Sequence, residues 1–487
     1  MPVTAEFIEE LKQIVGPQAV STSPIDKVVY MHSLAYHLFP WQAEVIVVPQ
    51  SDPAGNHPIP QIVSLANKYK VPVTCKGGIG MGGSAPRQGG VLIDMCRMEK
   101  VLEINEDLGY VIAEGGASVY QIMYELRQHG MTLPCYGTYE SATNIGGTII
   151  NAGIGYGETR YGWLADMVTG LEVVLPNGDV VRHGSLANQY TEFGPFQRHV
   201  NGPDAVSLYI QSMGNFGIIT KVALRTIHFK RENLHEYCYA WRRDQIEDFQ
   251  KAMIEIGKTK IYDVHFNDRW TFYWQIKEGW LHEVPDDAWF FLPTMLYANN
   301  QKELEGQEEL MRDVYTQYGG IEVPEIARVH MRGADPSRWT SWHVHGPGGW
   351  IGPAARNGGM FACMSFYYPL TKFAEMYQID EQIKKQVGLW CPEHFPQHDS
   401  FVTNEQSIKE QWFCSWNPYN PEHLQKVGAW MGMASQIVAQ KGACWHGPCL
   451  PNQPRYSFEK LGPAYDFLKD MKDYFDPNDI LNPTSIR

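Results

Sequence analysis

The chain has 487 residues, and its 40 Lys and Arg against 54 Asp and Glu give a formal net charge of −14 at pH 7. With 44% hydrophobic, 13% aromatic and 19% charged residues it is neither disordered nor fibrous, and its length suits two or three domains. The negative charge disfavours nucleic acid or an anionic membrane as partner, because phosphates would be repelled.

The first residues and the cysteines predict a cytoplasmic protein. The opening stretch MPVTAEFIEELKQIVG has the pattern of an amphipathic helix rather than a signal peptide. No apolar stretch approaches the roughly 20 residues that a membrane span requires. The 9 cysteines are odd in number and widely scattered, which favours reduced thiols.

The first half of the chain alternates short strands with helices. Its predicted elements, in chain order, are a strand at 43–49, a helix at 60–70, strands at 71–76 and 89–95, two strands within 101–114, a helix at 118–130, a hairpin at 171–184 and a strand at 217–227. Ser118 is a suitable N-cap for the second helix, and Asn177–Gly178 is a suitable hairpin turn. The pattern predicts an α+β fold built from βαβ and hairpin units.

The composition changes near residue 230. Helical stretches alternate there with strand-like runs such as 360–369, and most of the 15 tryptophans lie between 230 and 441. This segment predicts a second domain with its own sheet and covering helices. Most of these tryptophans are expected in the core, and a few are candidates for lining an apolar pocket.

The stretch Lys76–Ser84 contains the pattern G-x-G-x-x-G after a predicted strand. A Rossmann site needs a helix to begin at this point, but the chain continues into another strand, so we reject that interpretation. Glycines let a ligand approach the backbone, and a loop between strands can present its N–H groups to an anion. A glycine-rich surface hairpin is the alternative.

Two further glycine stretches lie beside predicted strands. In Thr138–Tyr156, Gly146 and Gly147 permit close packing, and neighbouring Ser and Thr residues offer hydroxyls. In Ser212–Ile219, a glycine turn enters a strand. Three such turns predict one extended ligand lying across the domain, with its phosphates bound without a helix end.

The order of these segments resembles the flavoproteins related to vanillyl-alcohol oxidase and p-cresol methylhydroxylase. The segments are VPVTCKGGIGMGGSAP, GGVLIDMCRMEKVLEIN, GYVIAEGGASVYQIMYELRQHGMTLP, ATNIGG, GIGYGETRYG, LEVVLPNGDVVRHGS, GNFGIITKVAL and DPNDILNPTSIR. The resemblance implies a two-part FAD-binding domain of the vanillyl-alcohol-oxidase type at 1–229 and 442–487. It also implies an α+β cap domain with an antiparallel sheet at 230–441, and a homo-oligomer.

The resemblance also assigns the cofactor contacts. The first glycine loop would hold the FAD pyrophosphate, the second stretch would follow the ribityl and phosphate portion, and the third would lie near the adenine half. The residues expected to bind FAD are Lys76, Gly77, Gly78, Ile79, Gly80, Met81, Gly82, Gly83, Ser84, Thr138, Ser141, Thr143, Gly146, Gly147, Gly217 and Ile218.

We expect FAD to be bound non-covalently. The family often attaches it through a His or Tyr of the cap, and the corresponding stretch Pro353–Phe361 contains neither. His32 or His37 could serve as a linkage site of another type.

Three positions differ from the phenol-oxidising members of the family. Met81 stands in place of a tyrosine of the loop, His446 in place of an arginine, and Asn151 in place of an acidic residue beside the flavin. A histidine is charged only below its pKa of about 6.5, whereas arginine is a permanent cation. These differences argue against a para-alkylphenol bound as its phenolate.

Oxidation of an alcohol requires hydride transfer to flavin N5 and a base for the hydroxyl proton. Histidine suits the role of this base. His343 and His345 are two residues apart, so in a strand their side chains would lie on the same face. The alternatives for this pair are a base with its partner, a pair of metal ligands and a chance arrangement. The candidate catalytic residues are His446, His343, His345 and Asn151. The candidate substrate-binding residues are Met81, Trp445, Arg356 and Trp416, with Arg356 suited to a carboxylate or to a structural ion pair.

Cys391, His394 and His398 have the spacing of zinc ligands, but two prolines and the lack of a second Cys-x-x-Cys argue against a metal site. The sequence therefore predicts an FAD-dependent oxidoreductase that oxidises an aryl, benzylic or allylic alcohol and passes electrons to oxygen or a redox protein. The alternatives are an FAD-dependent 2-hydroxyacid dehydrogenase and a non-catalytic flavin-binding or partner protein.

Overall fold

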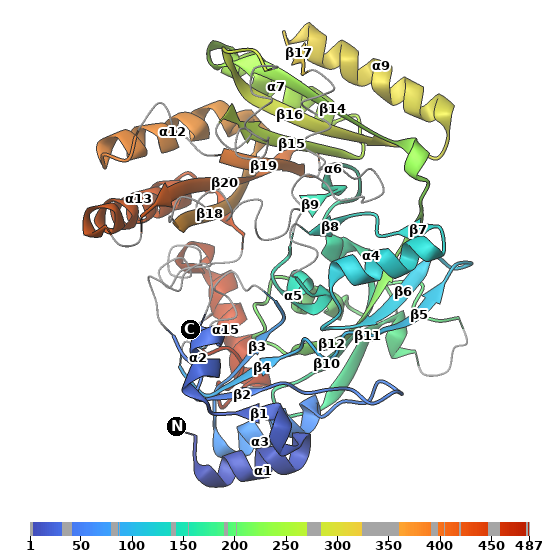
Figure 1. The fold of residues 1–487 in the computed structure, drawn as a ribbon, viewed down its shortest axis with the longest axis vertical. Coiled ribbons are helices and arrows are strands. Elements are labelled where there is room, and N and C mark those ends of the chain that lie inside the picture. The colour runs from blue at the N-terminus through green and yellow to red at the C-terminus, as the bar shows by residue number, and fades with distance from the viewer. Residues whose placement is uncertain are drawn as a thin grey trace. The chain divides into compact units, whose positions relative to one another are not determined.

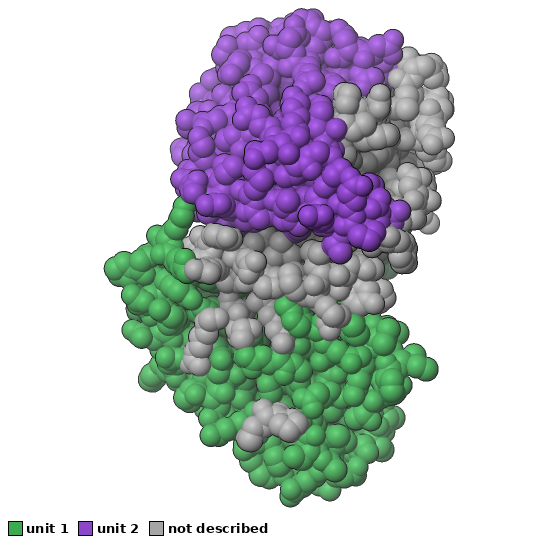
Figure 2. All heavy atoms as spheres, turned by 90° about the vertical axis from the view of Figure 1, so that its left-hand side faces the viewer, with its two compact units in different colours: residues 1–153, 164–228, 447–487 green, residues 154–163, 229–446 purple. Residues whose placement is uncertain are grey.

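The computed structural model divides into two compact units, which Figure 2 colours separately. Unit 1 comprises residues 1–153, 164–228 and 447–487, and unit 2 comprises 154–163 and 229–446. The segment 154–163 thus groups with unit 2, although the sequence-based boundaries place it in the first domain. The structure describes residues 3–31, 41–78, 86, 88–137, 143–153, 155–188, 193–200, 202–269, 284–323, 360–390, 398–403, 405–417, 420–446, 458–483 and 486.

A four-stranded sheet begins unit 1, in the order β1-β2-β4-β3. β2, β4 and β3 are parallel, and β1 pairs antiparallel to β2. Phe7 and Leu11 of one helix and Ile62 and Val63 of another pack with the strands in a single apolar core. The elements of this layer are α1 (Ala5–Val15), β1 (Val20–Ser21), α2 (Pro24–Tyr30), β2 (Val45–Val47), α3 (Ile59–Tyr69), β3 (Val73–Lys76) and β4 (Val91–Asp94).

A five-stranded antiparallel sheet completes unit 1, in the order β11-β10-β12-β6-β5. Its strands are β5 (Val101–Asn105), β6 (Tyr110–Glu114), β10 (Val168–Val174), β11 (Val180–Gly184) and β12 (Ile218–Arg225). The remaining elements of the unit are α4 (Val119–Gln128), β7 (Met131–Thr132), β8 (Tyr136–Gly137), α5 (Ile145–Ile150), β13 (Ile227–His228) and α15 (Pro463–Phe475). Ser118 caps α4 by accepting from the Gln121 N–H, as predicted.

The last segment of the chain, residues 447–487, groups with unit 1. Two backbone hydrogen bonds join the residues after α15 to β3. The Val73 N–H donates to the Ile480 carbonyl at 2.7 Å, and the Asn482 N–H donates to the Val73 carbonyl at 2.8 Å. The buried Lys472 ammonium donates to the Leu481 carbonyl at 2.7 Å and to Asp476 at 2.6 Å. Because its charge is paired with Asp476 and hydrogen-bonded to a carbonyl, Lys472 is stable in this buried position and holds the end of the chain against the sheet.

Unit 2 is built on an eight-stranded sheet in the order β17-β14-β16-β15-β19-β20-β18-β21, and its strand pairs are antiparallel. The strands are β14 (Leu234–Arg242), β15 (Asp263–Asp268), β16 (Ala288–Tyr297), β17 (Ile321–Glu322), β18 (Met360–Pro369), β19 (His398–Thr403), β20 (Ser407–Trp416) and β21 (Cys444–Trp445). The predicted α+β class and the antiparallel sheet of the second domain are confirmed.

Helices cover one face of this sheet (Figure 1). On that face, Phe249 of α7 packs against Phe266, Phe290 and Phe373 with ring centroids 4.9–5.4 Å apart. Side chains alternate between the faces of a strand, so the neighbours of Phe266 point away from these helices. The helices of unit 2 are α6 (Glu158–Tyr161), α7 (Ile246–Gly257), α9 (Gln301–Gln317), α12 (Phe373–Gln386) and α13 (Pro421–Gln440), and β9 (Gly155–Tyr156) precedes α6.

Over the described ranges, no helix combines the length and the hydrophobicity that a bilayer crossing requires.

Candidate functional site

The first and second glycine stretches lie side by side in unit 1. Gly78 forms an antiparallel bridge with Thr143, and Ser118 forms another with Asn144. Gly77 has no room for a side chain, because a Cβ there would lie 1.9 Å from the Asn144 Nδ2. The start of the predicted phosphate loop therefore lies so close to the second stretch that a side chain at residue 77 would have to displace that of Asn144.

The second stretch begins a helix rather than a turn, which corrects the sequence-based expectation. Asn144 caps α5 by accepting from the Gly147 N–H at 2.8 Å. Asn before an apolar run is an N-cap signal, and here it prevails over the turn preference of the glycines. A Cβ on Gly146 would lie 2.8 Å from the Gly115 carbonyl oxygen, so this glycine lets the helix approach β6.

The third stretch meets the end of the same helix. The Gln211 N–H donates to the Ile149 carbonyl at 3.3 Å, and the Met213 N–H donates to the Ile150 carbonyl at 3.2 Å. At Gly217, a Cβ would lie 2.4 Å from the Val173 Cγ1. All three glycine stretches therefore converge around α5, and the small residues and close backbone at their contacts fit an extended dinucleotide such as FAD.

Two further predicted site residues of this region, Lys76 and Asn151, contact other residues of the protein. Burial lowers the pKa of Lys76, which the charge of Asp94 partly offsets, and its ammonium lies 5.4 Å from the Tyr30 ring centroid. The Asn151 side chain donates to the Gly147 carbonyl at 2.9 Å, at the C-terminus of α5. Six consecutive predicted FAD contacts, Ile79–Ser84, together with Thr138 and Ser141, lie outside the described residues.

In unit 2, the face of the sheet opposite α7 and α13 carries a polar cluster around His446. The Tyr367 hydroxyl and the His446 Nδ1 are 2.7 Å apart. Burial and, to a smaller extent, the positive charge of Lys409 hold the pKa of His446 well below its usual value. Burial, helped by the charge of Glu158, raises the pKa of Tyr367 well above 10. At neutral pH the pair is therefore a neutral imidazole bonded to a neutral phenol.

The strand register aligns Lys409 with this pair. His265 of β15 pairs with residue 401 of β19, which pairs with Lys409 of β20, which pairs with Tyr367 of β18. Residues paired across an antiparallel sheet share a face. Lys409 is 3% exposed. Burial and its charge together hold the pKa of His265 well below the usual value, so the cation stands between two neutral imidazoles.

The segment 155–163 packs onto this polar face. Tyr156 stacks on His265 with ring centroids 6.1 Å apart, and Trp163 lies against Tyr367 at 5.1 Å. Glu158 is buried and accepts from the Gly155 N–H at 2.7 Å. Asp263 accepts from the Gly157 N–H at 3.0 Å. These contacts explain why residues 154–163 group with unit 2.

The other predicted site residues are distributed differently. Trp445 is buried and packs edge-on against Phe366, so it lies on the helix-covered face while the His446 ring contacts Tyr367. Trp416 ends β20, and its side chain lies outside the described residues, as do His343, His345, Arg356 and Met81. Whether these residues bind substrate stays a prediction.

Lys409, His265 and Tyr367 belong to this cluster, although the sequence-based predictions do not include them. A signal was present in the strand Ser407–Trp416, where the charges of Lys409 and Glu410 interrupt an apolar run. Adjacent positions of a strand point to opposite faces, so two neighbouring charges indicate polar groups on both sides of the sheet. Only the pairing register reveals that one of these charges lies beside His446.

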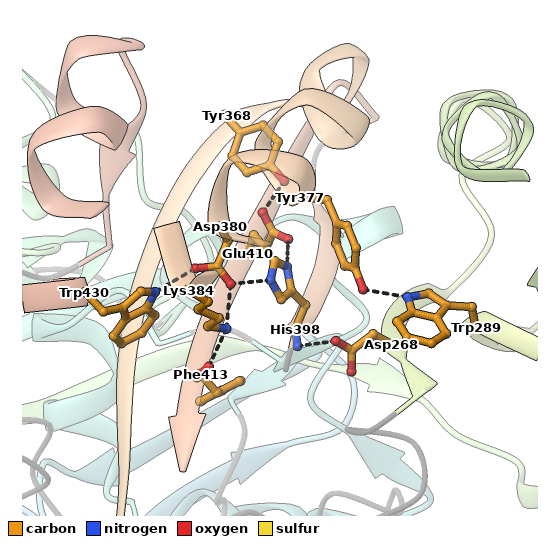
Figure 3. A network of polar contacts seen from close by, with 10 residues as sticks. All are labelled: Asp268, Trp289, Tyr368, Tyr377, Asp380, Lys384, His398, Glu410, Phe413 and Trp430. Atoms are coloured by element: carbon orange, nitrogen blue, oxygen red, sulfur yellow. Dashed lines mark hydrogen bonds and ion pairs between the residues drawn. The ribbon is translucent and has the colours of Figure 1, made fainter. Parts of the chain in front are cut away.

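The candidate zinc ligand His398 belongs to a different cluster, on the helix-covered face (Figure 3). Its Nδ1 lies 2.7 Å from Glu410 and its Nε2 lies 2.8 Å from Asp380. Asp380 also pairs with Lys384 at 2.6 Å and accepts from the Trp430 indole at 2.7 Å. Both ring nitrogens of His398 are occupied by protein carboxylates. Within the described part of the chain, no three His, Cys, Asp or Glu side chains form a possible metal site.

Comparisons with known proteins identify an FAD-binding domain that spans the first and second glycine stretches. A family model described as "FAD binding domain" matches residues 47–184. The chain is 28% identical to a D-lactate dehydrogenase of Anaerostipes hadrus over 99% of this chain and 98% of that protein. It is 27% identical to the glycolate oxidase subunit GlcD of Bacillus subtilis (strain 168), over 46% of this chain and 45% of that subunit.

Solved structures share the fold over nearly the whole chain. A 4-ethylphenol oxidase from Gulosibacter chungangensis, in its isoeugenol complex, has a TM-score of 0.82 at 19% identity and covers 99% of this chain and 98% of that one. A p-cresol methylhydroxylase with substrate bound has a TM-score of 0.80 at 18% identity and covers 99% and 97% of the two chains. These likenesses show the common architecture.

Proposed function

We propose that this chain belongs to the FAD-dependent oxidoreductases related to vanillyl-alcohol oxidase and p-cresol methylhydroxylase, and that it oxidises an activated alcohol, such as a benzylic or allylic one. The observation that carries the proposal is the pairing of His446 with Tyr367 on the polar face of the unit 2 sheet, onto which segment 155–163 packs. A hydroxyl proton must be removed as its carbon is oxidised, and this pair is suited to take it.

The protonation states of the pair suit that role. A base must be neutral before it acts, and the lowered pKa of His446 keeps the imidazole neutral at pH 7. Tyr367, whose pKa is raised, stays protonated and can donate to the imidazole while its oxygen accepts the substrate proton. The two side chains thus form a short path along which a proton leaves the substrate.

The glycine stretches of unit 1 would hold FAD, which accepts the hydride when bound. Gly77, Gly78 and Thr143 would present backbone groups to the phosphates, supported by the close contact between the two stretches. We propose that the FAD is non-covalent, and denaturation of the purified protein should then release it into the supernatant. We propose further a cytoplasmic homo-oligomer, which sedimentation analysis tests for subunit number.

A substrate panel tests the proposed activity. Purified protein should contain or take up FAD, and benzylic or allylic alcohols should be oxidised with oxygen or an artificial dye as acceptor. Failure of the protein to bind FAD would overturn the cofactor assignment. Bound FAD that no alcohol reduces would favour a non-catalytic flavin protein.

A second candidate function is the oxidation of a 2-hydroxy acid. It is favoured by the similarity to a D-lactate dehydrogenase that extends over 99% of this chain. Lactate, glycolate and mandelate in the same panel separate the two candidates, since a carboxylate beside the reacting carbon would be required for turnover in one case and dispensable in the other.

A further inference from the structure

We propose that a cavity of unit 1 binds a small phosphate-bearing metabolite, such as a phosphorylated sugar. The cavity has a volume of about 360 Å³ and is lined by the end of α1, the loop that follows β2 and the start of α3. Helices α1 and α3 pack side by side (Figure 1). This volume is within the range of small-molecule sites. The described residues that line the cavity include none of those assigned to FAD, so the proposal adds a second ligand to the proposed function.

The start of α3 is the first argument. The helix begins at Ile59 after Pro58, and no side chain caps this end. The first N–H groups of a helix have no partner within the helix, and their partial positive charge attracts anions. Because Pro58 and Gln61 both line the cavity, the uncapped end of α3 opens into it.

The orientation of His57, just before α3, is the second argument. Its side chain is 5% exposed and lines the cavity, and its Nε2 lies 3.4 Å from the Glu172 Oε1. Burial raises the pKa of Glu172, but the hydrogen bond from His57 and the charges of Lys221 and Arg182 outweigh burial and lower it to about 2. An ionised carboxylate has no proton to donate, so the His57 Nε2 is the donor and Nδ1 is left for another contact.

The chemistry of the His57 Nδ1 favours a phosphate as that contact. The atom is buried and has no hydrogen-bond partner among the residues that the structure describes. A phosphate monoester titrates near pH 6, so its hydroxyl can donate to a neutral imidazole and its dianion can accept from a protonated one. A carboxylate at neutral pH can only accept. A phosphate therefore satisfies Nδ1 in either protonation state of the ring.

The side chains across the cavity lining are the third argument. Arg97, which follows β4, is exposed, lines the cavity and forms no ion pair with a described residue. A guanidinium binds a phosphate through two parallel hydrogen bonds. The carboxamides of Gln18, Gln50 and Gln61 also line the cavity. Carboxamides both donate and accept hydrogen bonds, which suits the hydroxyls of a sugar.

The charges around the cavity indicate a local site rather than general attraction. The chain carries a net charge of −14, which repels anions. Asp52 also lines the cavity, and its carboxylate accepts from the N–H groups of Ala54 at 2.8 Å and Asn56 at 2.9 Å. That carboxylate is thus hydrogen-bonded within its own loop. Arg97 and the start of α3 supply the positive charge that an anionic ligand would contact.

The matched ligand pair for the test is ribose 5-phosphate and ribose, with inorganic phosphate as a third probe. Each would be titrated by calorimetry into protein saturated with FAD, so that the FAD site is closed to other phosphates. Ribose 5-phosphate should bind about tenfold or more tightly than ribose, and inorganic phosphate should compete with it. Equal binding of ribose 5-phosphate and ribose, or no detectable binding of either, would overturn the proposal.

Arg97→Met should weaken the binding of ribose 5-phosphate about 30-fold, or ~2 kcal/mol, and leave that of ribose unaffected. Arg97→Lys, which keeps the charge, should restore part of the affinity. Arg242→Met serves as the matched control, because Arg242 pairs with Asp244 at 3.1 Å in unit 2 and its loss changes the net charge equally. An unchanged affinity in Arg97→Met, or an equal loss in Arg242→Met, would contradict the assignment to this cavity.

His57→Gln keeps an N–H donor for Glu172 and removes Nδ1, so the affinity for ribose 5-phosphate should fall about fivefold. If this variant fails to fold, the exposed Arg97→Met and the wild-type comparison of ribose 5-phosphate with ribose decide alone. Phosphate binding in a protein whose flavin no alcohol reduces would reject the proposed oxidation and keep the phosphate site. Oxidation of alcohols without any preference for the phosphorylated sugar would reject the phosphate site and keep the oxidation.

Discussion

The two faces of the unit 2 sheet bury charged groups in opposite ways. On the helix-covered face, Asp380, Glu410, Lys384 and His398 form a closed network in which each charge meets its opposite at 2.6–2.8 Å (Figure 3). On the other face, the imidazoles of His265 and His446 stay neutral, and His446 lies 2.7 Å from the Tyr367 hydroxyl. The difference teaches that burial alone does not mark a functional charge. The closed network of opposite charges stabilises the fold, whereas a neutral hydrogen-bonded pair is able to take up a proton.

Breaking the closed network should have the largest effect. Asp380→Ala leaves His398, Lys384 and the Trp430 indole without their common acceptor and should lower the free energy of unfolding by about 3–5 kcal/mol. Chemical denaturation followed by circular dichroism measures this loss.

The matched control lies on the same helix. Lys385→Ala removes an exposed ion pair with Glu381 and should cost less than about 1 kcal/mol. Equal losses in the two variants would mean that the buried network contributes no more than a surface pair.

The same network predicts how stability depends on pH. Burial disfavours the charged form of His398, but Glu410 and Asp380 outweigh it and raise its pKa to about 9. A raised pKa stabilises the fold fully below the unfolded value of about 6.5, and this contribution is lost as pH rises towards 9. The charged and titratable groups that face His398 are Lys384, Asp380, Glu410 and Tyr377, together with Asp268, whose carboxylate accepts a hydrogen bond from the His398 backbone N–H.

Thermal unfolding between pH 6.5 and 9.5 tests this dependence. The midpoint should fall with rising pH in wild-type protein, and the fall should be smaller in His398→Gln. A flat profile in wild-type protein would show that His398 is not charged in the folded state.

On the polar face of this sheet, Tyr367→Phe should reduce turnover about tenfold, or ~1.4 kcal/mol, because the hydroxyl proposed to bridge substrate and His446 is lost. The unfolding free energy should change far less than in Asp380→Ala. A change in KM with kcat preserved would place Tyr367 in binding rather than in proton removal.

Ser365→Ala should have the smallest effect. Its buried hydroxyl makes no hydrogen bond among the described residues, so stability should stay within about 0.5 kcal/mol of wild type. A marked loss of stability would indicate that the hydroxyl is already engaged in the folded protein.

Local patterns predicted much of the fold. The strands and helices of the first half follow from apolar periodicity and from caps such as Ser118, and the antiparallel sheet of unit 2 follows from runs such as 360–369. The helix at Ile145–Ile150 was missed because its two glycines suggested a turn, although Asn144 before it is a cap.

The site was predictable only in part. Glycines that permit close backbone approach are a local signal, and contacts such as that between Gly77 and Asn144 bear out their convergence. The polar face of unit 2 joins His265, Lys409 and His446, which lie far apart in the sequence. Their proximity depends on strand order and register, which no local pattern contains.

Anaerobic reduction of the bound flavin tests the central claim most directly. Mixing the FAD-loaded protein with benzylic alcohols, allylic alcohols and 2-hydroxy acids in a stopped-flow instrument should bleach the visible flavin band with at least one of them. His446→Gln should slow that phase about a hundredfold or more while FAD stays bound. A flavin band that no compound of these classes bleaches, or one that bleaches equally fast in His446→Gln, would contradict the account.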